Sequence, residues 1–230
     1  MIIYIGVDDT DTLESRGTGR LARGIADNLA REFTILGVVR HQLLVDPRVP
    51  YTSHNSCAVI VIEGQENTSL PALFERVKAL MLDDFQEGSD PGLCVTAHVP
   101  EAVTAFGRKA QRALVKQQEA RELAAAHGIM LEGLGGTQDG VIGSIAGVGL
   151  TAAGDDGRYL QVGRIRELTG LQTIEAVLNA GVTAIQTVEG QPVIEGLILA
   201  DKLRPARRNG KPVALVNWDQ DHWQPIKPER

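Results

Sequence analysis

The sequence predicts an α+β fold in two parts, and three features of the 230-residue chain carry this prediction. Over residues 1–99, short apolar runs rich in β-branched residues alternate with helical patterns, which is typical of strands and helices that share a core. A glycine-rich turn and a helix of small residues follow at 133–154. The remaining residues form short strand-like runs separated by Gly, Asn and Pro, which indicates a small β-rich region.

The first part contains six predicted elements. Leu21, Ile25 and Leu29 recur every four residues on one face of a helix, and Pro71 suits the first turn of another. In chain order, the elements are a strand at 2–7, a helix at 17–32, strands at 34–45 and 57–63, a helix at 69–82 and a strand at 93–99. This order, β-α-β-β-α-β, is that of a split βαβ, or ferredoxin-like, sheet.

A helix-rich region with a glycine loop comes next. One long helix is predicted over 101–127, ended by Gly128, and a short strand at 129–132 leads into the glycine-rich turn at 133–140. The apolar helix of small residues then occupies 141–154. We therefore place an α/β core at 1–154.

Residues 155–230 are predicted to form a smaller α+β extension. Asn209-Gly210 is a strong hairpin signal between two apolar-containing arms. The other elements predicted here are a helix at 172–180 and strands around 183–188 and 193–200. The tail at 218–230 has no interpretable pattern.

The composition is that of a cytoplasmic globular protein. Hydrophobic residues make up 43% and charged residues 23% of the chain, and no apolar run approaches the roughly 20 residues that span a bilayer. The N-terminus enters a strand pattern directly, so we expect no secretory signal. Cys57 and Cys94 lie in apolar strands, and we expect buried free thiols. A net charge of −6 does not favour non-specific binding to nucleic acids.

Three carboxylates follow the first strand within four positions: Asp8, Asp9 and Asp11. Carboxylates this close repel one another unless a cation neutralises them, and such a group suits Mg²⁺ held together with substrate phosphates. Aspartates are also common in turns, where they accept backbone hydrogen bonds. We favour a metal or phosphate site here, with Asp9 also a candidate catalytic residue.

Thr18 stands between Gly17 and Gly19 at the start of the first helix. A helix N-terminus bordered by glycines offers free N–H groups and a partial positive charge to an anion, so all three residues are candidates for phosphate binding. The Thr18 hydroxyl has three alternative roles: it caps the helix, binds a phosphate or accepts one covalently. The sequence leaves these alternatives open.

The second glycine-rich turn lies between a strand and the helix of small residues. This arrangement resembles a phosphate loop but has no Walker lysine. The candidate nucleotide-binding residues here are Gly135, Gly136, Thr137, Asp139, Gly140 and Gly143. Close packing of a glycine-rich helix explains the same pattern equally well.

The polar loop at 46–56 offers Arg48 and Asn55 as substrate-binding candidates and His54 as a catalytic candidate. Two basic clusters are further candidates for holding a phosphate-bearing partner, although a solvated face is the commoner explanation of such runs. The clusters are Arg108, Lys109, Arg112 and Lys116 on the predicted long helix, and Lys202, Arg204, Arg207, Arg208 and Lys211 around the hairpin.

Three segments in matching order resemble archaeal tRNA(Ile) agmatidine synthetase, a family that uses ATP to attach agmatine to the wobble cytidine. Its Gly-Ile-Asp-Asp-Thr-Asp-Ser signature is similar to Gly6–Thr12, with Thr18 at the matching place. Its Asn-Pro-Asn-x-Pro-Trp segment, followed by Asn-Gly-Ala, is similar to 46–51 and 55–58. Its Gly-Leu-Ile-Gly-Ala-Leu-Ala-Ala-Ile-Gly segment resembles 140–149.

The resemblance implies a kinase-like core in which the aspartates hold Mg²⁺ and ATP and the threonine lies close to phosphoryl transfer. The family's Cys-Thr-Thr is Gly17-Thr18-Gly19 here, and its Arg-Gly-Asn is Ser53-His54-Asn55. Family members also carry an OB-fold and a zinc ribbon that grip the tRNA, whereas this chain ends at Arg230 without a cysteine set for zinc. We therefore do not expect the tRNA substrate to carry over.

The sequence thus predicts an ATP/Mg²⁺-dependent kinase- or ligase-like transferase that acts on a small molecule. Two alternatives stay open: a non-catalytic nucleotide-binding module, and a tRNA-modifying enzyme that needs a partner chain for grip. The sequence names neither the acceptor nor the products of ATP cleavage. It also leaves the oligomeric state open, a homo-oligomer included.

Overall fold

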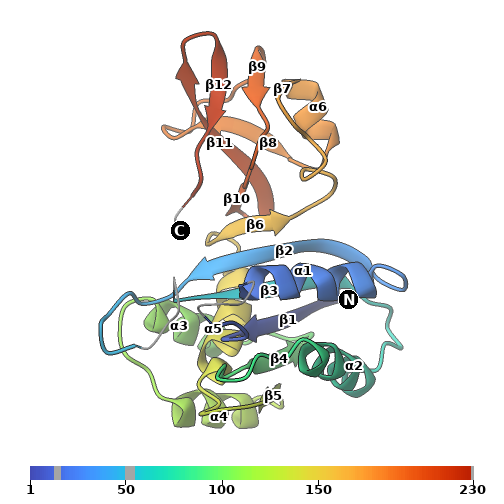
Figure 1. Ribbon diagram of the computed structural model, residues 1–230, viewed down its shortest axis with the longest axis vertical. Helices are drawn as coiled ribbons and strands as arrows, with labels where there is room; N and C mark the ends of the chain where they lie inside the picture. Colours follow the sequence, from blue (N-terminus) through green and yellow to red (C-terminus); the bar gives the residue numbers. More distant parts are fainter. Residues whose placement is uncertain (13–16, 50–54, 229–230) are drawn as a thin grey trace.

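A computed structural model describes residues 1–12, 17–49 and 55–228. Within these ranges the chain is a mixed α/β structure with six helices and a 12-stranded, largely antiparallel open sheet (Figure 1). No helix within the described ranges is long and apolar enough to cross a membrane.

The first six elements appear in the predicted order β-α-β-β-α-β, which is confirmed. They are β1 (Ile2–Asp8), α1 (Thr18–Leu29), β2 (Thr34–Gln42), β3 (Ser56–Glu63), α2 (Leu70–Asp83) and β4 (Gly92–Thr96). The strands lie in the order β4-β1-β3-β2, so the N-terminal strand β1 is central and pairs antiparallel with both β3 and β4. The predicted start of α2 is also correct, because the Ser69 side chain accepts a hydrogen bond from the N–H of Ala72.

The sheet is covered on both faces. On one face, alternate residues such as Ile3, Ile5 and Ile60 pack against α1 and α2. On the other, Val59, Cys57 and their neighbours pack against the later helices. Cys57 and Cys94 are buried free thiols, as predicted.

The predicted long helix is wrong: the structure has two helices, α3 (Glu101–Ala110) and α4 (Gln117–Ala126). The carbonyl of Ala110 accepts a hydrogen bond from the N–H of Leu44, and the Gln111 side chain donates to the carbonyl of Gln42 at 3.0 Å. These tertiary contacts hold the end of α3 against the segment after β2. The predicted basic stripe is therefore divided, because Arg112 and Lys116 lie between the helices.

The next two elements, β5 (Met130–Gly133) and α5 (Gly140–Ala153), agree with the prediction. Glycines stand where α5 meets its neighbours. A Cβ added at Gly6 on β1 would overlap the carbonyl oxygen of Ser144, and one added at Gly92 on β4 would overlap the backbone of Gly140. On the opposite side of α5, a Cβ at Gly107 of α3 would come within 2.6 Å of the carbonyl oxygen of Ala146. Helix α5 thus lies between the sheet and α3 at backbone contact distance.

The C-terminal part is β-rich, as expected, but several of its strands were not predicted. Its elements are β6 (Arg158–Gln161), β7 (Leu171–Thr173), α6 (Ile174–Asn179), β8 (Ala184–Thr187), β9 (Leu197–Leu199), β10 (Ala206–Arg208), β11 (Lys211–Asp219) and β12 (His222–Pro225). Strand β6 pairs with β2 on one side and β10 on the other, so the sheet continues into this part (Figure 1). The predicted Asn209-Gly210 turn joins β10 and β11, with both residues at positive φ.

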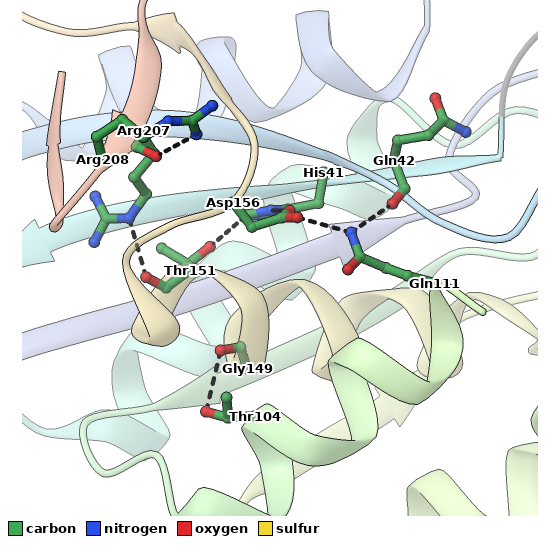
Figure 2. Close-up of polar contacts among 9 residues, drawn as sticks. All are labelled: His41, Gln42, Thr104, Gln111, Gly149, Thr151, Asp156, Arg207 and Arg208. Carbon is green, nitrogen blue, oxygen red and sulfur yellow. Dashed lines mark hydrogen bonds and ion pairs between the residues drawn. The ribbon is translucent and has the colours of Figure 1, made fainter. Parts of the chain in front are cut away.

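A buried polar network holds the C-terminal part to the core (Figure 2). His41 Nδ1 lies 2.6 Å from Asp156 Oδ1, and its Nε2 lies 2.7 Å from Thr151 Oγ1. The Gln111 side chain donates to the other oxygen of Asp156, and Arg207 donates from Nε to the carbonyl of Thr151. Burial lowers the pKa of His41, against the opposing effect of Asp156, so we take the ring as neutral.

The close packing of α5 predicts that Gly6→Ala destabilises the protein by about 3 kcal/mol or more, because the new methyl group meets a helix backbone that cannot move aside. Gly24→Ala is the matched control. Gly24 is exposed in the interior of α1 with open space around it, so alanine there should stabilise by about 0.5–1 kcal/mol. Denaturant unfolding measures both. Equal effects of the two substitutions would contradict the packing argument.

The network predicts a pH-dependent stability. The folded protein resists protonating His41, whereas the unfolded chain protonates it near 6.5, so stability is full above this pH and falls below it. The loss amounts to at most about 1.4 kcal/mol per pH unit. Thermal melts from pH 7.5 to 5 should show the wild type losing stability faster than His41→Asn, which keeps a donor towards Asp156 but does not titrate. Parallel melting curves would contradict the prediction.

Candidate functional site

Two acidic residues mark the end of β1. Asp8 is the last residue of the strand, paired with Gly92, and Asp9 follows with a positive φ of 50°. The carbonyl of Asp9 accepts a hydrogen bond from the N–H of Asp90 at 3.1 Å, and the carbonyl of Asp90 accepts one from the N–H of Gly140. The end of β1, the turn before β4 and the start of α5 are therefore tied together.

These carboxylates are electrostatically strained. Burial raises the pKa of Asp8 well above its ordinary value, and the neighbouring charges of Asp9 and Asp11 add to this. Burial, followed by the charges of Asp90, Asp11 and Asp139, raises the pKa of Asp9 to about 6. Four carboxylates thus act on Asp8 and Asp9 from three segments of the chain. A cation would relieve this repulsion.

Thr18 is buried and is the first residue of α1, with Gly17 at the N-cap position. Its hydroxyl donates a hydrogen bond to Asp11 Oδ1 at 2.9 Å and accepts one from the hydroxyl of Thr10 at 3.1 Å. The hydroxyl is therefore held beside the carboxylate group rather than used as the helix cap. This geometry keeps the phosphate-binding and covalent roles open.

The second glycine-rich turn is packed around Asp90. A Cβ at Gly136 would overlap Asp90 Oδ1, which accepts a hydrogen bond from the N–H of Thr137. A Cβ at Gly135 would come within 2.6 Å of the Phe85 ring. These glycines therefore have a packing role.

Gly143 lies in the first turn of α5, where a Cβ would overlap Asp8 Oδ2. Gly140 similarly lies against Asp8's carbonyl oxygen and the backbone of Gly92. Close packing of glycine explains both positions as well. The absence of a side chain at Gly143 leaves room for the Asp8 carboxylate at the start of the helix.

A cavity of about 420 Å³ opens beside the carboxylates. Asp8, Asp9, Asp139 and Gly143 line its acidic end. Apolar side chains line much of the rest, including Leu43, Leu44, Val49, Leu114 and Val115, together with the polar Arg48, Asn55, Lys116, Gln117 and Gln118. A volume of this size with one apolar wall and a few converging polar groups is typical of a small-molecule site.

The candidates from the loop after β2 lie at the same cavity. Arg48 and Asn55 both line it, but each is already bonded. Arg48 forms a two-pronged ion pair with Asp46, which lowers the pKa of that carboxyl to about 2. The Asn55 side chain donates to the carbonyl of Leu44 at 2.7 Å. His54 lies outside the described residues.

The structure separates two groups of candidates that the sequence had placed in one phosphate site. Gly17, Thr18 and Gly19 line a different cavity, together with Asp11. The residues Asp8, Asp9, Asp139 and Gly143 line the first. The end of β1 therefore lies between two cavities, with Asp8 and Asp9 on one side and Asp11 on the other.

Sequence analysis missed one carboxylate that acts on Asp9 and two contributors to the lining of the first cavity. Asp90 belongs to the Gly-Ser-Asp-Pro-Gly turn, and only the pairing of β1 with β4 brings it to Asp9. Gln117, at the start of α4, donates to Asp139 Oδ1 at 2.6 Å. The segment with Leu114 and Val115 forms the apolar wall because α3 ends early. No local sequence signal indicates these contacts.

Among the described residues, no group of three His, Cys, Asp or Glu side chains is arranged to hold a metal ion by itself. Mg²⁺ bound together with nucleotide phosphates needs only one or two carboxylates from the protein. The raised pKa values of Asp8 and Asp9 fit such a cation.

No protein-family model matches the chain. Over 150 residues the chain is 25% identical to the tRNA(Ile2) 2-agmatinylcytidine synthetase TiaS of Cenarchaeum symbiosum (strain A), which covers 64% of this chain and 33% of the synthetase. The chain is therefore homologous to part of TiaS, and the predicted resemblance is confirmed. It spans about a third of that relative's length.

Solved structures share the fold. A TiaS–tRNA(Ile2)–ATP complex matches with a TM-score of 0.58 at 23% identity, over 65% of this chain and 36% of that one. A tRNA fluorescent labeling enzyme matches with a TM-score of 0.57 at 24% identity, over 65% and 36%. A TiaS–tRNA(Ile2)–AMPCPP–agmatine complex gives 0.56 at 22% identity, over 64% and 36%.

The carboxylate repulsion predicts that Asp9→Asn stabilises the protein when divalent cations are removed with EDTA. Asparagine tolerates the positive φ and removes one of the repelling charges. Because water still reaches this partly buried side chain, we expect a gain of only about 1 kcal/mol, or roughly 2–4 °C in Tm. Asp219→Asn, at an exposed position in β11, is the control and should leave Tm unchanged. A lower Tm for Asp9→Asn would contradict the prediction.

Proposed function

We propose that this chain is an enzyme that transfers a phosphoryl or adenylyl group from ATP, in a Mg²⁺-dependent reaction, to an oxygen of a small-molecule acceptor. The cavity with a carboxylate end and an apolar wall is the observation that carries this proposal. Homology to part of TiaS, which has been solved with ATP and with AMPCPP, supports the choice of nucleotide.

The apolar wall suits a nucleobase, and the carboxylate end suits the metal-bound phosphates. Leu43, Leu114 and Val115 offer contact surface without charge, whereas Asp8, Asp9 and Asp139 bring carboxylates to the same cavity. Asp8 and Asp9 would hold Mg²⁺, which supplies positive charge to the phosphate oxygens when bound. Lowering the repulsion between the carboxylates would add to the binding energy of the metal–nucleotide complex.

In such a transfer the protein forms few covalent bonds with the reactants and acts mainly by positioning them and by stabilising charge. An acceptor oxygen attacks a phosphorus atom of ATP, and the bond to the bridging oxygen breaks as the new P–O bond forms. Attack at the γ-phosphorus releases ADP, and attack at the α-phosphorus releases pyrophosphate. Thr18 lies beside Asp11 and lines the second cavity, where its hydroxyl would contact the transferred group.

We assign the nucleotide chemistry to the core, residues 1–154, and an acceptor-positioning role to the extension, residues 155–230. The division rests on the order of elements and on separate hydrophobic clusters on the two sides of β2. The continuous pairing of β2 with β6 would hold the two parts in register.

Calorimetric titration of ATP tests the proposal. The wild type should bind ATP with Mg²⁺ and much more weakly with EDTA, and Asp9→Asn should reduce the Mg²⁺-dependent affinity by at least tenfold, or about 1.4 kcal/mol. Asp219→Asn removes the same charge at an exposed site outside both cavities and should bind normally. Phosphorus NMR then identifies the products as ADP with a phosphorylated acceptor, or pyrophosphate with an adenylylated acceptor.

The outcomes separate the alternatives. Mg²⁺-dependent binding without turnover in the presence of candidate acceptors would favour a non-catalytic nucleotide-binding module. Turnover that requires tRNA and a second chain would favour a tRNA-modifying enzyme. Absence of ATP binding, or equal binding by wild type and Asp9→Asn, would contradict the proposed site.

A further inference from the structure

The second cavity, of about 360 Å³, is rich in arginines. It lies where the N-terminus of α1, the strands β2 and β6 and the C-terminal part meet. Six of its described lining residues are arginines, and one, Asp11, is a carboxylate. The arginines are Arg20, Arg23, Arg40, Arg158, Arg166 and Arg204.

Three of these guanidinium groups repel one another. Burial lowers the pKa of Arg23, and the charge of Arg166 lowers it further. Burial likewise lowers the pKa of Arg204, with added repulsion from Arg166 and Arg23. A bound anion would offset the repulsion among these three guanidinium groups, so the cluster favours binding of an anion.

The same three side chains retain most of their hydrogen-bonding capacity. Arg23 donates to the carbonyl of Gly19 at 3.1 Å, Arg166 to that of Leu160 at 3.2 Å, and Arg204 to that of Leu203 at 2.7 Å. None of the three forms an ion pair with another described residue. A guanidinium carries five N–H donors, and its flat fork matches the oxygens of a phosphate.

The helix N-terminus adds to this positive field. Gly17, Thr18 and Gly19 line the cavity at the start of α1, where backbone N–H groups and the helix dipole favour an anion. Leu160 of β6 packs against Gly19, where an added Cβ would come within 2.7 Å of it. The helix end and the arginines of the C-terminal part therefore face one cavity.

We propose that this arginine-lined cavity binds the phosphate group of a small phosphate-bearing molecule, which is the acceptor of the transfer reaction. The assignment as acceptor rests on the proposed function, whereas the phosphate site rests on the cavity alone. Thr18 and Asp11 line this cavity and lie next to the carboxylates of the first. A molecule anchored here by its phosphate would reach towards the nucleotide from the opposite side of β1.

A small molecule fits the site better than a nucleic acid. The cavity, of about 360 Å³, has the size of a small-molecule site, and the protein as a whole carries a net charge of −6. An extended phosphate backbone needs a long basic surface, and base stacking needs aromatic residues, which make up only 4% of the chain.

Calorimetry with inorganic phosphate, against chloride at constant ionic strength and pH 7.5, tests the site. We expect millimolar binding by the wild type and at least a tenfold weaker affinity for the double variant Arg166→Gln/Arg204→Gln. Arg166 is exposed and Arg204 only partly buried, so the variant should fold, which circular dichroism verifies. Arg31→Gln removes a charge at an exposed position outside the cavity and should bind phosphate as the wild type does. Absence of phosphate binding by the wild type, or equal loss in Arg31→Gln, would overturn the proposal.

Two further titrations distinguish the proposed phosphate site from the ATP site and from a nucleic-acid-binding site. The double variant should still bind ATP with Mg²⁺, so loss of phosphate binding with ATP binding intact supports a separate anion site. If the wild type binds phosphate but not ATP, the proposed function fails while the phosphate site stands. The second titration uses an oligouridylate of about a dozen nucleotides at several salt concentrations. If the logarithm of its binding constant falls with the logarithm of the salt concentration with a slope steeper than about −2, the protein contacts several phosphates, and the small-molecule assignment is overturned.

Discussion

Helix α5 touches β1 and β4 through backbone atoms, because glycines occupy the points of closest approach on both sides. Because Gly6 and Gly92 have no side chain, the helix backbone can approach the sheet closely, and Gly107 allows the same close approach to α3. This depth of packing brings the first turn of α5 to the end of β1, where Gly143 leaves room for the Asp8 carboxylate. The acidic site therefore depends on a packing distance that only glycine allows.

The two cavities on either side of β1 have opposite charge. Asp8 and Asp9, whose pKa values are raised by burial and by neighbouring carboxylates, line one; Arg23 and Arg204, whose pKa values are lowered by burial and by neighbouring guanidiniums, line the other. Each cluster is costly for the empty protein, and each would be relieved by a partner of the opposite sign. Thr18, bonded to Asp11, lines the arginine-rich cavity, and Asp11 in turn acts on Asp9 of the other. The arrangement suits a reaction that brings a metal–nucleotide complex and an anionic acceptor together from two sides.

The sequence predicted those parts of the fold that local patterns specify. Leu21, Ile25 and Leu29 place α1, and Asn209-Gly210 places the β10–β11 turn. The end of α3 was missed because Leu114 and Val115 continue the helical pattern, and contacts with Leu44 and Gln42 override it. The acidic residues after β1 were recognised, but Asp90 and the arginine cluster were not, since both arise only when distant segments meet. Arg204 had been noted only as part of a basic run around the hairpin.

The central position of β1 also affects when the acidic site can form. Strand β1 precedes both of its partners, β3 and β4, along the chain, and the carboxylate of its last residue, Asp8, meets a helix that begins only at Gly140. Each of these contacts closes a long loop, at an entropic cost that grows with chain length, and such high contact order is associated with slow folding. The repelling aspartates thus come together only after most of the core has been synthesised, when the packing that holds them is already available.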